Sequence, residues 1–140
     1  MSGISHYGAN VFAGVMSGVY SIPATFYLGV TTSPVGPDHS ANQMTEPVDT
    51  SYARQQISMS STFWSTPVSG ITHNIAPVTF PVATEQWGPL NHWVITNSLT
   101  GGAIIMWSDF TQGIVVDIGN ALTIPAGTLS ISVVVPETMF

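Results

Sequence analysis

Residues 78–109, Val-Thr-Phe-Pro-Val-Ala-Thr-Glu-Gln-Trp-Gly-Pro-Leu-Asn-His-Trp-Val-Ile-Thr-Asn-Ser-Leu-Thr-Gly-Gly-Ala-Ile-Ile-Met-Trp-Ser-Asp, decide the fold. Two runs in this stretch, 90–97 and 103–109, are rich in β-branched and aromatic residues and flank a short connection that contains two glycines. That arrangement is typical of a β-hairpin. Three of the four tryptophans also lie here and supply apolar surface for a core: Trp87, Trp93 and Trp107. The stretch predicts the central hairpin of an all-β domain.

Immediately before the hairpin, Trp87-Gly88-Pro89 predicts a sharp corner in the chain. Glycine tolerates a positive φ that other residues avoid, and proline fixes its own φ and restricts the residue before it. We therefore expect the first strand of the hairpin to begin after this corner.

The rest of the chain predicts further short strands separated by turn signals every 8–12 residues. The clearest alternation lies in 128–135, where Leu129, Ile131 and Val133 share one face. The other expected strands are 24–31, 52–59 (with a continuation into 62–64), 71–75, 78–81, 114–116 and 121–124. Seven to nine short strands of this kind predict a single jelly-roll-like β-sandwich over 23–136, and 140 residues suit one domain.

Residues 1–22 are expected to form a short N-terminal helix or an arm. The helical pattern covers 7–18 and places four apolar residues on one face: Val11, Phe12, Val15 and Met16. Three glycines weaken this helix, at about 1 kcal/mol each relative to alanine. It therefore needs a partner surface, either the sandwich itself or a neighbouring molecule.

Residues 32–50 are rich in proline, glycine, asparagine and aspartate and contain few large apolar side chains. They predict a long exposed loop, and loops of this length are usually functional or make contacts.

Charged residues form only 6% of the chain, against roughly 25% in a typical soluble domain. The sequence contains one Lys or Arg residue, Arg54, and seven Asp or Glu residues. This composition excludes the usual modes of nucleic-acid binding and polybasic membrane attachment, which need many basic side chains. No apolar run reaches the ~20 residues that span a bilayer. Serine and threonine, 16 of each, and a mean hydropathy of +0.34 predict a chain that packs against other subunits. The alternative is a monomer with a neutral surface.

The absence of cysteine excludes disulfides, thiol catalysis and thiolate metal sites. The first residues lack the basic start and apolar run of a secretory signal. These features suit synthesis in a bacterial-type cytoplasm.

Catalytic and metal-binding motifs are weak. The four histidines are far apart, and we expect His92 to be half-buried and hydrogen-bonded in the hairpin. Asp38, His39 and Glu46 share the long loop and could hold a divalent ion, although a solvated loop is the simpler interpretation. The Gly-x-Ser-x-Gly nucleophile pattern and glycine-rich phosphate loops are absent. We expect no enzymatic activity, no metal and no cofactor.

Arg54 is the most informative charged residue because it is the only lysine or arginine in the sequence. Its partner is expected among Glu46, Asp49 and Glu85. Two interpretations remain open: an internal ion pair that stabilises the fold, or a contact with a neighbouring subunit.

The tryptophans offer a possible binding surface because their rings could stack on sugars. Trp64 and Trp87 lie beside irregular segments and are the best candidates for exposure and glycan contact. The alternative is that all four belong to the core.

An ordered series of short motifs runs through residues 24–135. It comprises Phe-Tyr-Leu-Gly-Val-Thr-Thr from 26, Thr-Glu-Pro from 45, Tyr-Ala-Arg-Gln from 52, Phe-Pro-Val-Ala from 80 with Trp-Gly-Pro-Leu-Asn-His-Trp from 87, Leu-Thr-Gly-Gly from 99 and Ile-Pro-Ala-Gly-Thr-Leu from 124. This series resembles a family of small tailed-phage virion proteins, often labelled phage tail fibre protein or minor structural protein. His92-Trp93 stands where that family usually has His-Phe.

The resemblance implies a non-enzymatic virion protein, made in the bacterial host cytoplasm. It implies an exterior accessory subunit, either a head decoration (cement) protein or a tail-fibre-type component. Its partners would be further copies of itself, a trimer being one option, and a major capsid or tail protein. The alternative is a lectin-like module that binds host glycans. By resemblance the assembly and structural signature positions are Tyr52, Arg54, Phe80, Pro81, Trp87, Gly88, Trp93, Gly101, Gly102 and Gly127.

Overall fold

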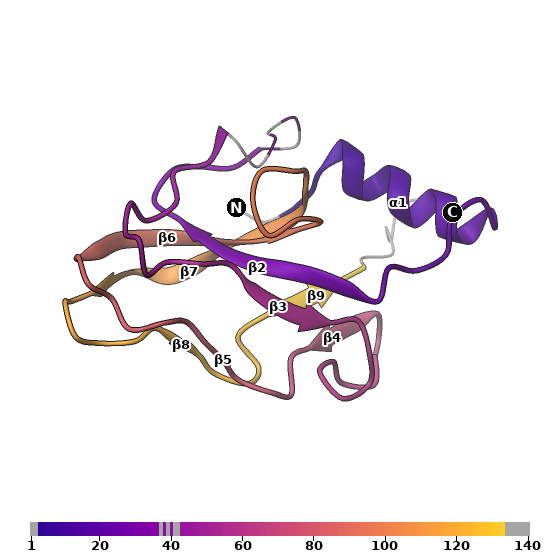
Figure 1. Ribbon diagram of the computed structural model, residues 1–140. Coiled ribbons are helices and arrows are strands. Elements are labelled where there is room, and N and C mark those ends of the chain that lie inside the picture. Colours follow the sequence, from indigo (N-terminus) through magenta and orange to yellow (C-terminus); the bar gives the residue numbers. More distant parts are fainter. Residues whose placement is uncertain (1–2, 37, 39, 41–42, 134–140) are drawn as a thin grey trace.

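The computed structural model describes residues 3–36, 38, 40 and 43–133, and its centre is the predicted hairpin (Figure 1). Strand β6 (Trp87–Thr96) pairs antiparallel with β7 (Ile104–Val116). Both strands are longer than predicted, and β7 absorbs the strand expected separately at 114–116. The expected start of the strand after 87–89 is wrong, because these residues lie inside β6. The expected positive φ at Gly88 is present, at +111°, and it coincides with a register shift between Trp87 and Leu90.

The hairpin belongs to a five-stranded antiparallel sheet in the order β1-β7-β6-β2-β3. The other members are β1 (Gly3–Ile4), β2 (Thr25–Thr31) and β3 (Gln55–Ser58). Two small ribbons pair β4 (Ile71–His73) with β9 (Ser130–Ser132), and β5 (Val78–Thr79) with β8 (Thr123–Ile124). The predicted all-β class is confirmed, and of the two alternatives expected for the N-terminal region, a short helix or an arm, the structure shows the helix.

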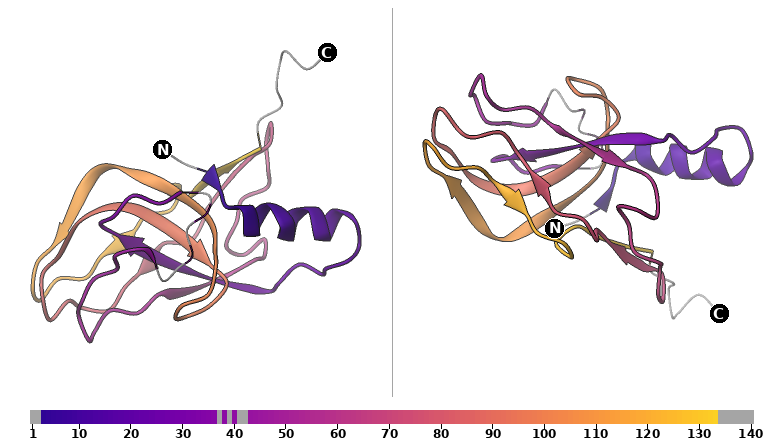
Figure 2. Two further views of the ribbon diagram at one scale, coloured as in Figure 1. Left: turned by 90° about the horizontal axis from the view of Figure 1, so that it is seen from above. Right: turned by 60° about the horizontal axis from the view of Figure 1, so that its bottom comes forward.

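The main core lies between one face of the sheet and the two ribbons (Figures 1 and 2). Strand alternation brings Leu28 and Ile95 to this face from neighbouring strands, and Ile124 and Leu129 approach from the ribbon side. All four are at most 1% exposed. Burial of such side chains contributes roughly 1.5–3 kcal/mol each, so the ribbons are held mainly by this core.

The opposite face of the sheet is covered by the loop that follows β2. Val35 and Met44 from this loop pack against Val94, Ile104 and Trp107. The loop is tied back to the sheet because the amide of Thr32 donates to the carbonyl of Thr45 (3.0 Å). The prediction of a wholly exposed loop over 32–50 is therefore wrong: its few apolar residues cover a second, smaller core.

Some predicted strand boundaries differ from the observed ones. The last strand is β9 alone, with Leu129 buried just before it and Val133 71% exposed just after it. Residues 134 and 135 lie outside the described chain. The continuation expected at 62–64 is a turn, followed by an isolated bridge between Trp64 and Asn74.

The predicted helix is α1 (His6–Met16), which projects beyond the end of the sheet (Figure 2). Ser5 caps it: its hydroxyl accepts from the amide of Gly8 (2.9 Å) and donates to the carbonyl of Ile104. Gly8 is buried against β7, where a Cβ would lie 2.3 Å from the carbonyl oxygen of Ile105. The glycine that weakens the helix is thus what lets it approach the sheet.

We predict that Gly8→Ala destabilises the protein by about 1–3 kcal/mol, the usual cost of overpacking. Helix propensity alone predicts the opposite sign, since alanine is favoured over glycine by about 1 kcal/mol. Urea unfolding followed by circular dichroism measures the difference. Gly36→Ala is the control, because a Cβ there meets nothing within 4 Å. A variant at position 8 that is more stable than wild type would contradict the close packing of α1 on β7.

Candidate functional site

Arg54 lies immediately before β3, beside the turn of the central hairpin, and its side chain is only 2% exposed. Its Nε and Nη2 atoms donate to the two carboxylate oxygens of Glu46, at 2.8 and 2.9 Å. Its Nη1 atom donates to the carbonyl oxygens of Ser98 and Gly101, both at 2.8 Å. The guanidinium therefore joins the long loop, β3 and the hairpin turn, and the predicted pairing with one of three carboxylates is present with Glu46.

The turn itself fits this role because Gly101 and Gly102 both have positive φ, 59° and 77°. Glycine adopts this conformation at little cost, whereas other residues rarely do. The Thr-Gly-Gly motif thus forms a turn whose carbonyl oxygens accept hydrogen bonds from Arg54, the only arginine in the sequence.

Tyr52 extends the network to β2. Its hydroxyl donates to Glu46 (2.7 Å) and accepts from the backbone amide of Val30 (3.2 Å). Burial, together with the negative charge of Glu46, raises the pKa of Tyr52 well above its ordinary value. The phenol therefore stays neutral and remains a donor to Glu46 throughout the physiological pH range.

Asp49 forms a second junction in the same loop. Its carboxylate accepts from the amides of Thr84 (2.9 Å) and Glu85 (3.0 Å), and from the indole Nε1 of Trp87 (2.7 Å). It also accepts from the Thr84 hydroxyl and from the amide of Ser51. Burial opposes the charged form of Asp49, but these hydrogen bonds outweigh it and hold the pKa of Asp49 well below its usual range. The loop is thereby fixed to the segment that precedes β6.

Aromatic rings fill the space between the two junctions. Tyr52 and Phe80 stack with centroids 6.1 Å apart, and Trp87 meets both rings edge to face, at 5.5 and 6.4 Å. Trp87 is 1% exposed and Phe80 2%. Motifs separated by up to about two-fifths of the chain therefore form one cluster, which we call the Arg54 cluster: Glu46, Asp49, Tyr52, Arg54, Phe80, Trp87 and the turn 98–101.

The remaining signature positions lie elsewhere. Trp93 is a core residue, 3% exposed, and Pro81 is exposed between β5 and β6. Gly88 lies at the irregularity in β6, and Gly127 has φ +88° in the turn before β9. Pro81 and Gly88 directly follow the cluster residues Phe80 and Trp87, whereas Trp93 and Gly127 lie outside the cluster.

The predicted glycan contacts are wrong as exposed stacking surfaces. Trp87 is buried in the Arg54 cluster, and Trp64 is only 9% exposed. Both lie beside irregular segments, as the sequence indicated, but those segments fold over the rings. Burial of a large aromatic ring is strongly favourable, so such a side chain joins the core even where the neighbouring residues form no regular strand.

The candidate ion-binding residues of the long loop have separate partners. Asp38 pairs with His6 (2.7 Å) and Glu46 with Arg54, while His39 lies outside the described residues. His92 is half-buried and lies 2.6 Å from Asp109, in agreement with its predicted hydrogen-bonded role. Among the residues that the structure describes, no three histidine or carboxylate side chains are grouped as metal ligands.

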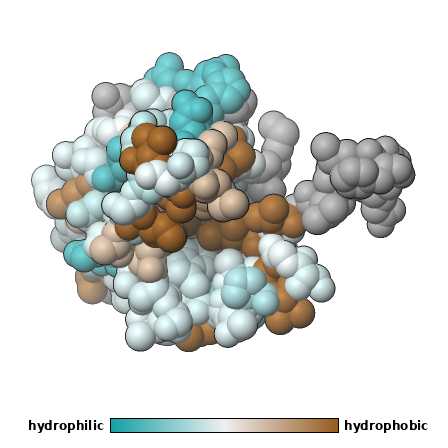
Figure 3. All heavy atoms as spheres, turned by 90° about the vertical axis from the view of Figure 1, so that its right-hand side faces the viewer, coloured by the Kyte–Doolittle hydropathy of each residue, from teal (hydrophilic) through white to brown (hydrophobic). Residues whose placement is uncertain are grey.

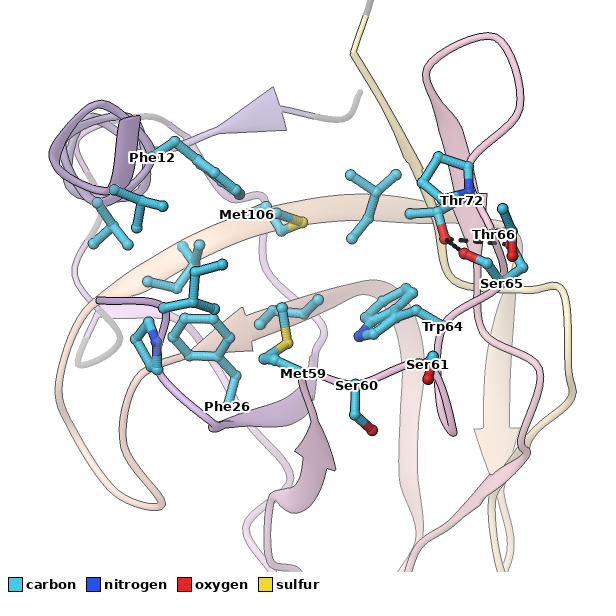
Figure 4. A pocket seen from close by; sticks show the side chains of 18 residues that line it. Phe12, Phe26, Met59, Ser60, Ser61, Trp64, Ser65, Thr66, Thr72 and Met106 are labelled. Carbon is cyan, nitrogen blue, oxygen red and sulfur yellow. Dashed lines mark hydrogen bonds between the residues drawn. The ribbon is translucent and has the colours of Figure 1, made fainter. Parts of the chain in front are cut away.

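A second feature is an apolar groove of about 530 Å³ between α1, the sheet and the segment 59–67. Figure 3 shows hydrophobic surface gathered in a hollow on this end of the molecule, and Figure 4 shows the lining side chains. Sequence reasoning missed this groove because its walls come from segments far apart in the chain.

Sequence reasoning also missed that Asp49 joins the loop to the segment before β6. One sequence pattern does point to a structural role for Asp49. Asp49-Thr50-Ser51 has the pattern of an Asx turn, and the Ser51 amide indeed donates to Asp49 (3.0 Å). The pattern indicates a local turn only. The contacts to Thr84 and Trp87 span 35 and 38 residues, and no local pattern indicates them.

The chain is thus an all-β fold in which Glu46, Asp49 and Arg54 tie the segment before β3 to the hairpin turn and to the segment before β6. A family model described as "Podophage GP4 fiber I protein gp80" matches residues 3–132, and the chain belongs to this family. The resemblance to small tailed-phage virion proteins is thereby confirmed, and the chain is a structural component of a phage virion. No curated protein matches it. In the described part of the chain, no helix is long and apolar enough to cross a bilayer.

We predict that Arg54→Ala lowers the free energy of unfolding by about 2–4 kcal/mol, somewhat less than the cost of breaking a fully buried pair, because it leaves the partly exposed Glu46 carboxylate without its cation and the Ser98 and Gly101 carbonyls without their donor. Chemical denaturation measures this loss, with Ser130→Ala on the exposed β9 as the control. The double variant Arg54→Met/Glu46→Leu should lose less than the sum of the two single changes, since it leaves no unpaired charge. Equal stability of Arg54→Ala and wild type would remove the structural role assigned to the pair.

We also predict that Asp49 contributes to acid sensitivity. Its folded pKa lies below that of the unfolded chain, about 3.9, so its contribution is fully present above that pH and is lost as pH falls toward the folded value. Unfolding free energies of wild type and Asp49→Asn, measured from pH 6 to pH 3, should therefore converge on acidification. Asp117→Asn serves as the control. A constant difference over this range would contradict the assignment.

Proposed function

We propose that this virion protein is a non-enzymatic accessory subunit on the exterior of a tailed-phage particle, where it assembles as a homo-oligomer and attaches to other virion proteins. Membership of a fibre protein family favours a fibre-type component over a head decoration protein. The partner in the particle would be a tail or capsid protein.

The observation that carries the oligomer is the exposed apolar surface of the N-terminal region. Seven large apolar residues between positions 4 and 22 are more than two-fifths exposed: Ile4, Tyr7, Phe12, Met16, Val19, Tyr20 and Ile22. So many exposed large apolar side chains within one short segment favour a region that contacts another molecule.

The non-enzymatic part of the proposal is supported by the use of the charged groups. Arg54, Glu46 and Asp49 are engaged with partners inside the fold. They connect the described residues 46–54 to the hairpin turn and to the segment before β6. Charged groups that are engaged in this way suit a subunit that contacts its neighbours through a defined surface.

The lectin-like alternative has lost the residues on which it rested, because Trp64 and Trp87 are buried. A titration of the protein with host surface polysaccharide, followed by tryptophan fluorescence, tests what remains of it. We expect no saturable change.

The location is tested by antibody-gold labelling of intact virions viewed by electron microscopy. We expect gold on the exterior of the particle at fibres, with disrupted particles as the control for epitope access. Gold over the whole head would replace the fibre assignment with decoration. Gold on disrupted particles alone would contradict an exterior position.

A further inference from the structure

The apolar groove beside α1 has walls that solvent reaches, although its floor belongs to the core. Val15 of α1, Ile131 of β9 and Met59 line it and are half-buried, and Phe12 of α1 is 46% exposed. Figure 4 shows Phe12 and Thr72 on opposite sides of the groove. None of the lining residues is charged. Covering these walls removes apolar surface from water, which is favourable, so the groove suits an apolar occupant.

The described part of the chain stops beside this groove. Its last residue is Val133, whose amide donates to the carbonyl of Gly70 (2.9 Å) in the turn before β4. Two residues before Val133, Ile131 lines the groove, and so does Pro67, three residues before Gly70. The residues that follow Val133 therefore start at the rim of the groove.

Residues 134–140 begin at that rim and have the composition of an apolar occupant. Their sequence is Val-Val-Pro-Glu-Thr-Met-Phe, with one carboxylate, Glu137. The other stretches outside the described chain, 1–2, 37, 39 and 41–42, are at most two residues long. Extended, seven residues reach about 23 Å, whereas the two residues from Val133 back to Ile131 cover about 7 Å of strand. The segment is therefore long enough to turn back over Ile131 and enter the groove.

We propose that residues 134–140 turn back and fill the groove of their own chain, with Met139 and Phe140 placed against α1. Pro136 suits the turn that this path needs, because proline pre-sets the backbone for the second position of a β-turn. Glu137 stays at the rim in contact with water, since a buried carboxylate without a cation is unfavourable and the groove lining supplies none. The inference goes beyond the proposed function and does not rest on it.

Tethering favours this occupant over a separate molecule. A segment joined to the fold at Val133 has an effective concentration in the millimolar range, so an intrinsic dissociation constant of about 1 mM gives half occupancy. Burial of two large apolar side chains is enough for an affinity of that order. A second copy of the chain would also bring a formal net charge of −6 against an equal charge, whereas the chain's own segment adds no such repulsion.

The segment would also support the second half of α1. The helix packs on β7 at Gly8, near its first turn, whereas Val11 and Val15 border the groove. Apolar side chains between these residues and Met59 would join the helix to the opposite wall. Isolated helices as short as α1 are marginal in water, so this contact would lower the rate at which its second half opens.

The first test measures where residues 134–140 lie. The sequence contains no cysteine, so Met139→Cys carries a single nitroxide spin label. We expect the label to remove the methyl NMR signals of Val15 and Met59 and to leave those of Val48, which does not line the groove. Val15 and Met59 signals that keep their full height would overturn the proposal.

A mixing experiment separates the chain's own segment from that of another copy. Spin-labelled protein without isotopes is mixed with methyl-labelled protein that carries no spin label, and the subunits are allowed to exchange. We expect the Val15 and Met59 signals to persist in this mixture. Their loss would show that a second copy supplies the segment, which contradicts occupancy within one chain.

Hydrogen exchange of the full-length chain tests the effect on α1. In Met139→Ser/Phe140→Ser we expect the amides of 14–16 to exchange roughly 5–30-fold faster than in wild type, because opening no longer exposes two buried side chains. Val82→Ser/Ile118→Ser is the matched control, since those residues are 53% and 69% exposed and do not line the groove. Unchanged exchange in the first variant, or equal acceleration in both, would overturn the inference. Gold labelling of virions is indifferent to this outcome, so the proposed function stands or fails separately.

Discussion

The bidentate ion pair between Arg54 and Glu46 is the constraint on which the rest of the structure depends. A guanidinium that is only 2% exposed has to find hydrogen-bond acceptors inside the protein, because an unpaired buried charge is strongly unfavourable. Its acceptors come from the long loop and from the hairpin turn at the same time. The N–H groups of Arg54 therefore find all of these acceptors only when the loop, β3 and the hairpin turn lie in this arrangement.

Two further contacts depend on that arrangement. Glu46 is held where the Tyr52 hydroxyl can donate to it, and Tyr52 is then placed against Phe80 and Trp87. Trp87 in turn donates to Asp49, which returns the network to the loop where it began. The circuit fixes a long, proline-rich segment in a chain that contains no cysteine and therefore no disulfide.

Local sequence patterns predicted the parts of the fold that local physics determines. The hairpin and β2 follow from alternation and turn residues, and the Arg54 pair follows from the presence of a single cation among few carboxylates. The failures arise where distant segments meet. Trp64 and Trp87 sit beside irregular stretches, but folding brings other segments over them. Val35 and Met44 looked isolated in a polar loop, yet they cover the second face of the sheet, and no periodicity could indicate that face.

Because the only arginine is buried inside the fold, it is not free to form contacts between identical copies of the chain. The chain has no other lysine or arginine, so its surface offers carboxylates and histidines but no permanent cation. A contact between identical copies therefore cannot be built on ion pairs of the Lys or Arg kind, and the net charge of −6 acts against it at low ionic strength. Apolar burial and hydrogen bonds from uncharged groups are what remain. The exposed apolar side chains of Met16, Val19, Tyr20 and Ile22, beside the uncharged groove next to α1, supply apolar surface of this kind.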